Sequence, residues 1–148
     1  MNKVIRKRPI LVVDDDRDDR EMLEKAFQKG KVANPICFLQ DGRELIDYLE
    51  RKGKYSGTEK IPSPCFILLD LNMPKMGGLE ALSKIKACSI HQNIPVIILT
   101  TSRAQEDVLK SYDQGASSFI TKPENFEGLT RMVTDLQRYW LETVELPS

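Results

Sequence analysis

The chain has 148 residues with 22 Lys plus Arg and 22 Asp plus Glu, so its formal net charge at pH 7 is zero. This length fits one domain with a substantial core, and 41% hydrophobic and 30% charged residues are typical of a globular protein. The balanced charge excludes a global field that would recruit nucleic acid or an anionic membrane, so any electrostatic function must reside in local clusters.

The first segment, MNKVIRKRPILVV, is basic, and its apolar run ends at Asp14. A signal peptide needs a longer apolar stretch, and no segment could span a bilayer. Cys37, Cys65 and Cys88 show neither CxxC spacing nor an even count, which favours reduced core thiols over ligands or disulfides. We therefore expect a soluble cytoplasmic protein with no membrane partner.

Five short apolar runs predict strands that are covered on both faces. They are ILVV (10–13), ICFL (36–39), CFILL (65–69), VIIL (96–99) and SFIT (118–121). The segments that follow them carry apolar residues at helical spacing, and Gly or Pro separates these segments. The five stripes are Met22, Leu23, Ala26 and Phe27; Leu45, Ile46 and Leu49; Leu79, Leu82 and Ile85; Val108, Leu109 and Tyr112; and Phe126, Leu129, Met132, Val133, Leu136 and Trp140.

This alternation predicts an α/β fold of the (βα)5 type. Its doubly wound parallel five-stranded sheet should have the flavodoxin-like order 2-1-3-4-5, with helices on both faces. One connection is long: RKGKYSGTEKIPSP (51–64) is polar and rich in glycine and proline. A solvated surface loop is the favoured interpretation, and a partner-docking loop is the alternative.

Polar residues follow four of the five predicted strands. The carboxyl ends of parallel strands meet at one edge of the sheet, so these residues should lie close together. They are Asp14 and Asp15 after the first strand, Asp70 and Asn72 after the third, Thr100 after the fourth and Lys122 after the fifth. Three more acidic residues of VVDDDRDD, Asp16, Asp18 and Asp19, are expected to begin the first helix instead.

The acidic residues at this edge predict a magnesium site. Crowded carboxylates repel one another unless a cation neutralises them, and ligands that are all oxygen suit a hard divalent ion such as Mg²⁺. Asp15 and Asp70 can supply carboxylates directly, and Asp14 can hold a coordinated water. The backbone carbonyl of Asn72 can complete the protein ligands.

The other residues at the edge predict a site for phosphoryl transfer. A carboxylate can accept a phosphoryl group, and the Lys122 ammonium and the Thr100 hydroxyl can each bind a phosphoryl oxygen. Asp70 is the expected nucleophile because its strand is the most apolar and central one. Each motif also has a plain structural interpretation, since Lys-Pro often forms a turn and threonine is common in strands. The combination at four strand ends favours the functional one.

Four segments carry a resemblance to a known family. ILVVDDDRDDR, FILLDLNMPKMGGLEAL, IPVIILTTS and GASSFITKP resemble the receiver domain of two-component response regulators, over essentially residues 8–140. The resemblance implies that Asp70 accepts a phosphoryl group from a phosphohistidine of a sensor histidine kinase. It also implies that Asp14 and Asp15 bind Mg²⁺, that Thr100 and Lys122 contact the phosphoryl group, and that the Lys122–Pro123 bond is cis. A receiver of this kind is not an enzyme, because it catalyses only its own phosphorylation and dephosphorylation.

The same resemblance assigns a switch. Phe119 matches the aromatic residue that swings inward as Thr100 moves toward the phosphoryl group, which repacks the predicted helix around 108–112, strand 118–121 and helix 126–140. An ordinary core role for Phe119 is the competing interpretation. Two positions depart from the family: Gly77 replaces an Asp or Asn, and Thr101 replaces a common alanine. We expect a modest change in stability at Gly77 and narrower access at Thr101.

Only LETVELPS (141–148) follows the last predicted helix, so we expect one receiver domain over 1–148, no output domain and no binding to DNA. The ending RYWLETVELP, with LTTS, SYD and the long loop, resembles regulators that pair with cyanobacterial phytochrome-type kinases. This implies a phytochrome-type kinase partner. It also implies a homodimer through the switch surface and the tail, for which the residues of interest are Tyr139, Trp140, Leu141 and Leu146. Alternatively, Trp140 covers its own core.

Two other functions fit the predicted fold. A Mg²⁺-dependent phosphohydrolase of the haloacid-dehalogenase type also uses a strand-end aspartate, but it needs a second Asp two residues on, where this chain has Asn72. An amide cannot transfer protons at neutral pH, which disfavours rapid hydrolysis. Flavodoxin-type FMN binding needs a loop whose N–H groups bind phosphate, and the acidic DDDRDD would repel it.

Overall fold

The computed structural model describes residues 8–58 and 60–147. Residues 1–7 of the basic N-terminal segment, Glu59 of the long loop and Ser148 lie outside the described residues. Five parallel strands form one sheet in the order β2-β1-β3-β4-β5, as the sequence predicts. The strands are β1 (Ile10–Val13), β2 (Ile36–Leu39), β3 (Phe66–Leu69), β4 (Val96–Thr100) and β5 (Ser118–Thr121).

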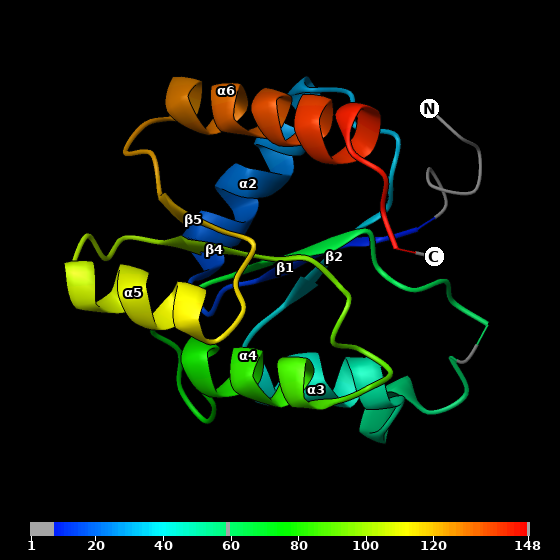
Figure 1. Cartoon of the computed structure of the whole chain (residues 1–148). Helices are drawn as coiled ribbons and strands as arrows, with labels where there is room; N and C mark the ends of the chain where they lie inside the picture. The colour runs from blue at the N-terminus through cyan, green and yellow to red at the C-terminus, as the bar shows by residue number, and fades with distance from the viewer. Residues whose placement is uncertain (1–7, 59, 148) are drawn as a thin grey trace.

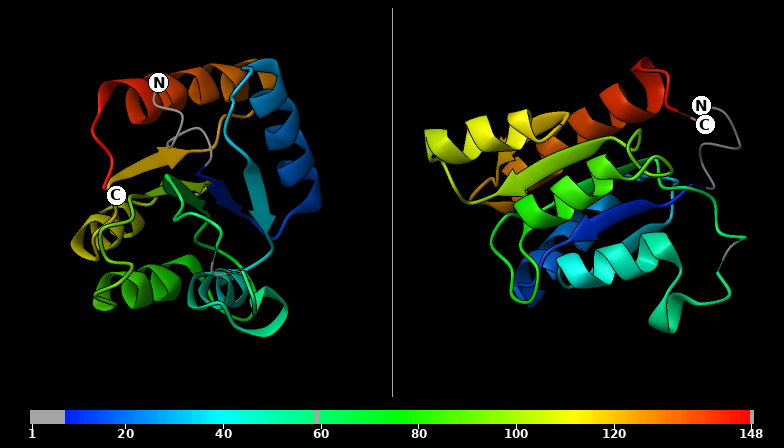
Figure 2. Two further views of the ribbon diagram at one scale, coloured as in Figure 1. Left: turned by 90° about the vertical axis from the view of Figure 1, so that its right-hand side faces the viewer. Right: turned by 60° about the horizontal axis from the view of Figure 1, so that its bottom comes forward.

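Helices cover both faces of the sheet (Figure 1). One face carries α2 (Arg17–Lys29) and α6 (Phe126–Leu136). The other carries α3 (Gly42–Glu50), α4 (Gly78–Ala87) and α5 (Gln105–Asp113), and the further views in Figure 2 show the same two layers. Each layer has its own buried apolar cluster, and β1, β3 and β4 contribute alternate residues to both clusters. The central strands are therefore buried on both sides, which explains their continuous apolar sequences.

Side-chain caps fix where three helices begin. Asp16 precedes α2, and its carboxylate accepts a hydrogen bond of 3.0 Å from the backbone N–H of Asp19. Before α3, the Asp41 carboxylate accepts a hydrogen bond from the backbone N–H of Glu44. Before α6, the amide oxygen of Asn125 accepts one from the backbone N–H of Gly128. Gly77 precedes α4 without a side-chain cap. The predicted helical role of the acidic residues after Asp15 is thus confirmed for Asp16, which satisfies an otherwise unpaired N–H at the helix start.

The last predicted helix changes type before its end. After Leu136 the chain continues as the π-helix η2 (Gln137–Thr143), which the apolar periodicity did not predict. Trp140 packs against Phe66 with their ring centroids 6.2 Å apart, so it covers its own core. Leu141 is only 4% exposed. The expectation that Leu141 offers a dimer contact is therefore wrong, because the wider turn directs it into the core.

The fourth helix is less buried than its apolar stripe indicates. In α5, Leu109 is 57% and Tyr112 48% exposed, and Val108 is half-buried. Tyr139 of η2 is 53% exposed. The stripe at 108–112 thus correctly predicts a helix, but much of its apolar surface faces solvent.

The long loop at 51–64 is fastened to the fold near both ends. It contains the short 3-10 helix η1 (Gly53–Tyr55), where the Tyr55 hydroxyl donates a 2.6 Å hydrogen bond to Glu44 of α3. Lys54 forms a 2.7 Å ion pair with the same carboxylate. At the other end, the buried Arg8 guanidinium donates to the carbonyls of Ser63 and Pro64, each at 2.9 Å. The loop is exposed, as predicted, but it is also held in place.

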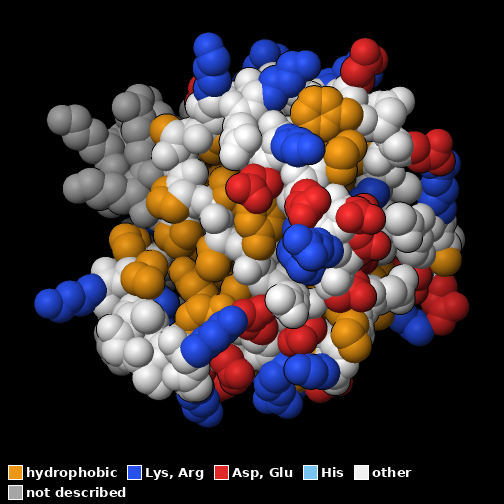
Figure 3. Space-filling model, turned by 180° about the vertical axis from the view of Figure 1, so that it is seen from behind, with side chains coloured by type: hydrophobic (Ala, Val, Ile, Leu, Met, Phe, Trp, Pro, Cys, Tyr) orange, Lys and Arg blue, Asp and Glu red, His pale blue; other side chains and the backbone are white. Residues whose placement is uncertain are grey.

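Charged side chains of both signs are interspersed over the face in Figure 3. The mixture of signs on this face agrees with the formal net charge of zero. Among residues 8–58 and 60–147, no helix has the length and apolar character needed to cross a membrane.

Candidate functional site

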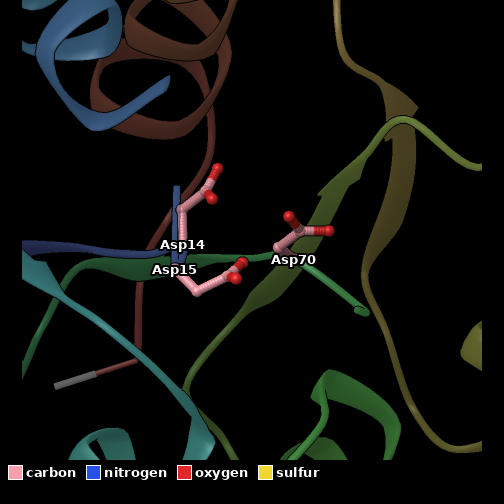
Figure 4. Close-up of side chains that lie close together, drawn as sticks. All are labelled: Asp14, Asp15 and Asp70. Atoms are coloured by element: carbon pink, nitrogen blue, oxygen red, sulfur yellow. The ribbon is translucent and has the colours of Figure 1, made fainter. Parts of the chain in front are cut away.

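The predicted acidic residues meet at the carboxyl ends of β1 and β3. These strands are neighbours, and the backbone N–H of Asp70 donates a 3.0 Å hydrogen bond to the Val13 carbonyl. Asp14, Asp15 and Asp70 each place one carboxylate oxygen within 4.8 Å of the others. Figure 4 shows the three side chains projecting from these two strand ends, with Asp15 extended toward Asp70. The sequence prediction for these three residues is thus consistent with the geometry.

Asp14 is the most buried carboxylate of this cluster. Its Oδ1 accepts a 2.9 Å hydrogen bond from the Asp16 N–H, and its Oδ2 accepts one of 2.6 Å from Lys122. Burial raises the pKa of Asp14, and the Asp70 charge adds to this, while the bonds from Lys122 and Asp16 oppose it. The Arg20 guanidinium donates to the Asp14 backbone carbonyl at 2.7 Å and brings a second cation to the edge.

Lys122 lies at the centre of the acidic groups. Its Nζ contacts Asp14 Oδ2 at 2.6 Å, Asp19 Oδ2 at 2.8 Å and Asp70 Oδ2 at 3.1 Å. Burial alone lowers the pKa of Lys122, but the bonds to Asp14 and Asp19 and the Asp70 charge outweigh it, so the pKa is raised above its ordinary value. The ammonium is therefore always charged near neutral pH, and all three of its donors are directed at carboxylates.

Asp70 lies in a tightly packed turn between β3 and α4. Its Oδ1 accepts a 2.7 Å hydrogen bond from the Leu71 N–H. Behind it, a Cβ added to Gly78 would lie 2.1 Å from the Asp70 carbonyl oxygen, so only glycine allows α4 to start there. Asn72 follows as an exposed residue of the same turn. Its backbone carbonyl stays a predicted ligand.

Thr100 and Phe119 border the site on its β4–β5 side. Thr100 is fully buried, its carbonyl accepts a 2.7 Å hydrogen bond from the Lys122 N–H, and its hydroxyl accepts a long one of 3.4 Å from Ser102. Phe119 is half-buried against the core cluster that includes α3 and α4, and its N–H donates to the Tyr112 hydroxyl at 3.1 Å. Both residues are near Lys122 in the sheet, but their role as a switch stays a prediction.

The sequence did not predict that Asp19 belongs to the site, and the predicted cis isomer of the Lys122–Pro123 bond is wrong. Asp19 was expected only to begin the first helix, yet its carboxylate also binds Lys122. Its position three residues after the cap at Asp16 places it in the first turn of α2, but this spacing alone does not reveal the contact with Lys122. The Lys122–Pro123 bond is trans and not cis, since the described chain contains no cis peptide bond. Trans is the lower-energy isomer of an X–Pro bond.

The donor set fits a hard divalent cation. All three cluster members offer carboxylate oxygens, which Mg²⁺ and related ions prefer, and no sulfur or imidazole ligand belongs to this group among the described residues. Asp15 is exposed and has an open side toward solvent, while Asp14 and Asp70 are buried. Such a site can bind one cation and still leave space for an additional anionic ligand.

Comparison with known proteins decides the family. Residues 10–134 match the model for the response regulator receiver domain. The chain belongs to the response regulator receiver family. Its match to the response regulator Rcp1 of Synechocystis has 37% identity and covers 94% of this chain and 92% of Rcp1. These proteins act in two-component systems, so the family match leaves the haloacid-dehalogenase alternative without support.

Solved receiver structures agree with the fold of this receiver. The crystal structure of the phosphorylated cyanobacterial phytochrome response regulator RcpA has a TM-score of 0.88 at 34% identity, covering 96% of this chain and 99% of RcpA. The Mn²⁺-bound form of Rcp1 has a TM-score of 0.84 at 36% identity, covering 95% of this chain and 99% of that one. The likeness to regulators associated with phytochromes is therefore confirmed in both sequence and structure.

Proposed function

We propose that this receiver is a phosphoacceptor response regulator, in which Asp70 takes a phosphoryl group from a phosphohistidine of a sensor histidine kinase in the presence of Mg²⁺. The observation that carries the proposal is the meeting of the Asp14, Asp15 and Asp70 oxygens within 4.8 Å, beside a lysine bonded to two of them. Neither a plain Lys-Pro turn nor an ordinary helix cap requires this arrangement.

Asp70 is the nucleophile because its carboxylate is held in place and faces Lys122. Oδ1 is fixed by the Leu71 N–H, and Oδ2 points at the ammonium. In the transfer, a carboxylate oxygen forms a bond to phosphorus as the bond from phosphorus to the histidine nitrogen breaks. The electron pair stays on that nitrogen, and the product is an acyl phosphate on Asp70.

The remaining residues bind charge and position the group. Lys122 pairs with one phosphoryl oxygen, and the Thr100 hydroxyl bonds another. Asp15 and Asp70 would hold Mg²⁺ through carboxylate oxygens, Asp14 through a water molecule and Asn72 through its backbone carbonyl. When bound, the cation supplies neutralisation of the negative charge that phosphoryl oxygens bring.

Output follows from repacking near Thr100. Movement of its hydroxyl toward the phosphoryl group draws Phe119 inward, and this alters the surface of α5, β5 and α6. Phe119 is half-buried, so an inward movement would bury more of its ring. We place the protein in the cytoplasm as a receiver that acts by protein contact, with its own phosphorylation and dephosphorylation as the chemistry it catalyses.

Labelling followed by intact-mass measurement tests this function. Incubation with acetyl phosphate or a phosphorylated kinase and Mg²⁺ should add one phosphoryl group to the wild type. Asp70→Asn should add none, and Asp18→Asn, an exposed carboxylate near the site, should be labelled as the wild type is. Equal labelling of Asp70→Asn and wild type would show that Asp70 is not the acceptor.

The proposed function also includes two protein partners, a second copy of the chain and a sensor kinase. A groove of about 710 Å³ lies between β5 and α6, lined by Ile120, Met132, Leu136, Tyr139 and Trp140 among others. With exposed Leu109 and Tyr112 on α5, it makes the switch surface partly apolar. We propose that this surface forms a homodimer and that the kinase is of the phytochrome type. Light scattering should give a dimer mass that Tyr139→Ser lowers; a monomeric wild type would refute the dimer.

A further inference from the structure

Lys122 has one carboxylate partner outside the candidate metal cluster. Its Nζ lies 2.8 Å from Asp19 Oδ2, closer than the 3.1 Å to Asp70. Among the described residues, the group that could hold a metal comprises only Asp14, Asp15 and Asp70. Asp19 therefore binds the lysine without belonging to that group.

The other two partners of Lys122, Asp14 and Asp70, are also the carboxylates proposed to bind the metal. If Asp70 holds a divalent cation directly and Asp14 holds it through a water, part of the negative charge that now pairs with the ammonium serves the cation instead. Asp14 Oδ2 lies 2.6 Å from Nζ and Asp70 Oδ2 lies 3.1 Å away, so the two cations would compete for adjacent positions. Binding of the metal requires a place to which the ammonium can turn while it remains paired, since the Lys122 side chain is only 9% exposed.

Asp19 can be the partner with which the Lys122 ammonium stays paired. Its backbone N–H is fixed on the Asp16 carboxylate in the first turn of α2, and its side chain is 42% exposed, on the solvent side of the lysine. The backbone of Lys122 is fixed by its 2.7 Å bond to the Thr100 carbonyl, so only the side chain needs to move. A short rotation would keep Nζ paired with Asp19.

We propose that Asp19 is a positioning residue that holds the Lys122 ammonium on the α2 side of the site when Mg²⁺ engages Asp14 and Asp70. The inference rests on the proposed function and adds a residue to it. Without the Asp19 charge, Lys122 depends on Asp14 and Asp70 alone and competes with the metal for them. Loss of this charge should therefore weaken Mg²⁺ binding.

Calorimetric titration of Mg²⁺ into the metal-free protein at fixed ionic strength tests the proposal. Asp19→Asn should weaken binding about tenfold, in the range found for residues that are energetically coupled. Asp18→Asn is the matched control, because Asp18 is an exposed carboxylate of the same helical turn and all three donors of Lys122 are directed elsewhere. It should weaken binding less than about threefold, through long-range charge alone. Asp19→Ser should behave as Asp19→Asn does.

A double-mutant cycle shows whether the effect passes through the lysine. In a Lys122→Met background, Asp19→Asn should weaken Mg²⁺ binding no more than Asp18→Asn does. Equal effects of Asp19→Asn and Asp18→Asn in the wild-type background would overturn the inference, as would an undiminished effect in the Lys122→Met background. If the wild type binds Mg²⁺ but shows either result, only the inference fails. If the wild type binds none, the proposed metal site fails as well.

Discussion

Removal of one carboxylate from the metal-free cluster should stabilise the protein. The change is Asp15→Asn, which keeps the shape of the side chain and removes its charge. Asp15 is exposed and lies within 4.8 Å of the Asp14 and Asp70 oxygens, whereas the contacts of Lys122 go to other carboxylates. In the absence of metal, Asp15 therefore experiences repulsion that no direct ion pair with another of the described residues offsets.

Coulomb's law gives the size of the effect. Two unit charges at this separation repel by about 1 kcal/mol in a water-like dielectric, which suits an exposed group. Two neighbouring carboxylates contribute about 2 kcal/mol, and the nearby Lys122 charge offsets roughly half of this. A net gain of about 1 kcal/mol corresponds to a rise in melting temperature of about 2–4 °C for a domain of this size.

Thermal unfolding in EDTA, followed by circular dichroism, measures this rise. Asp18→Asn is the control, and it should leave the melting temperature unchanged or slightly lower because a charge that favours the helix N-terminus is lost. Added Mg²⁺ should raise the melting temperature of the wild type more than that of Asp15→Asn, since a ligand stabilises the state that binds it. An unchanged or lower value for Asp15→Asn in EDTA would refute the repulsion.

Four further variants test the packing and the ion pairs of the fold. Gly78→Ala should cost several kcal/mol in unfolding free energy by chemical denaturation, because its Cβ would lie 2.1 Å from the Asp70 carbonyl oxygen. Leu141→Ala should cost about 3 kcal/mol, whereas Tyr139→Ala on the exposed side should cost less than about 1 kcal/mol; similar losses would contradict the inward turn of η2. The last variant concerns the charge of Glu44. Burial acts to raise the pKa of Glu44, but the hydrogen bonds from Lys54 and Tyr55 outweigh it and lower this pKa below its ordinary value of 4.5. Its charge thus stabilises the fold above that pH. Glu44→Gln should lower the melting temperature at pH 7, and this effect should shrink as the pH falls below 4.5 and through the lowered pKa; an effect that does not change with pH would refute it.

The fold could be predicted because the central strands β1, β3 and β4 are buried on both faces and have unbroken apolar sequences, whereas the edge strands β2 and β5 are mostly half-buried. The helices between them carry caps and apolar stripes that agree with the same topology. Where the sequence was insufficient, the deciding contact lies far along the chain. The π-helix η2 depends on Trp140 packing against Phe66, 74 positions away in the sequence, and the long loop on Arg8 reaching Ser63. Local periodicity carries no information about such pairs.

Some residues of the site could also be predicted from the sequence, and one could not. Asp14, Asp15, Asp70 and Lys122 could be placed together because each directly follows a strand, and parallel strands end at one edge. Asp19 could not, because its role depends on how α2 leaves that edge and on the reach of a lysine 103 positions later. Its carboxylate binds Lys122 while its backbone N–H takes part in the helix cap, and the sequence pattern revealed only the second.

The charges at this edge indicate why a divalent cation suits it. Asp14, Asp15, Asp19 and Asp70 bring four negative charges within reach of one another or of Lys122, whereas Lys122 and Arg20 bring two positive ones. Two negative charges remain, which one divalent cation can neutralise. Without it, the edge repels a phosphoryl group, and the Lys122 ammonium is occupied by carboxylates. Neutralisation by a cation removes the repulsion. If Asp19 then holds Lys122 as proposed, the ammonium stays charged and paired at the edge of the site, from which it can turn to a phosphoryl oxygen on Asp70.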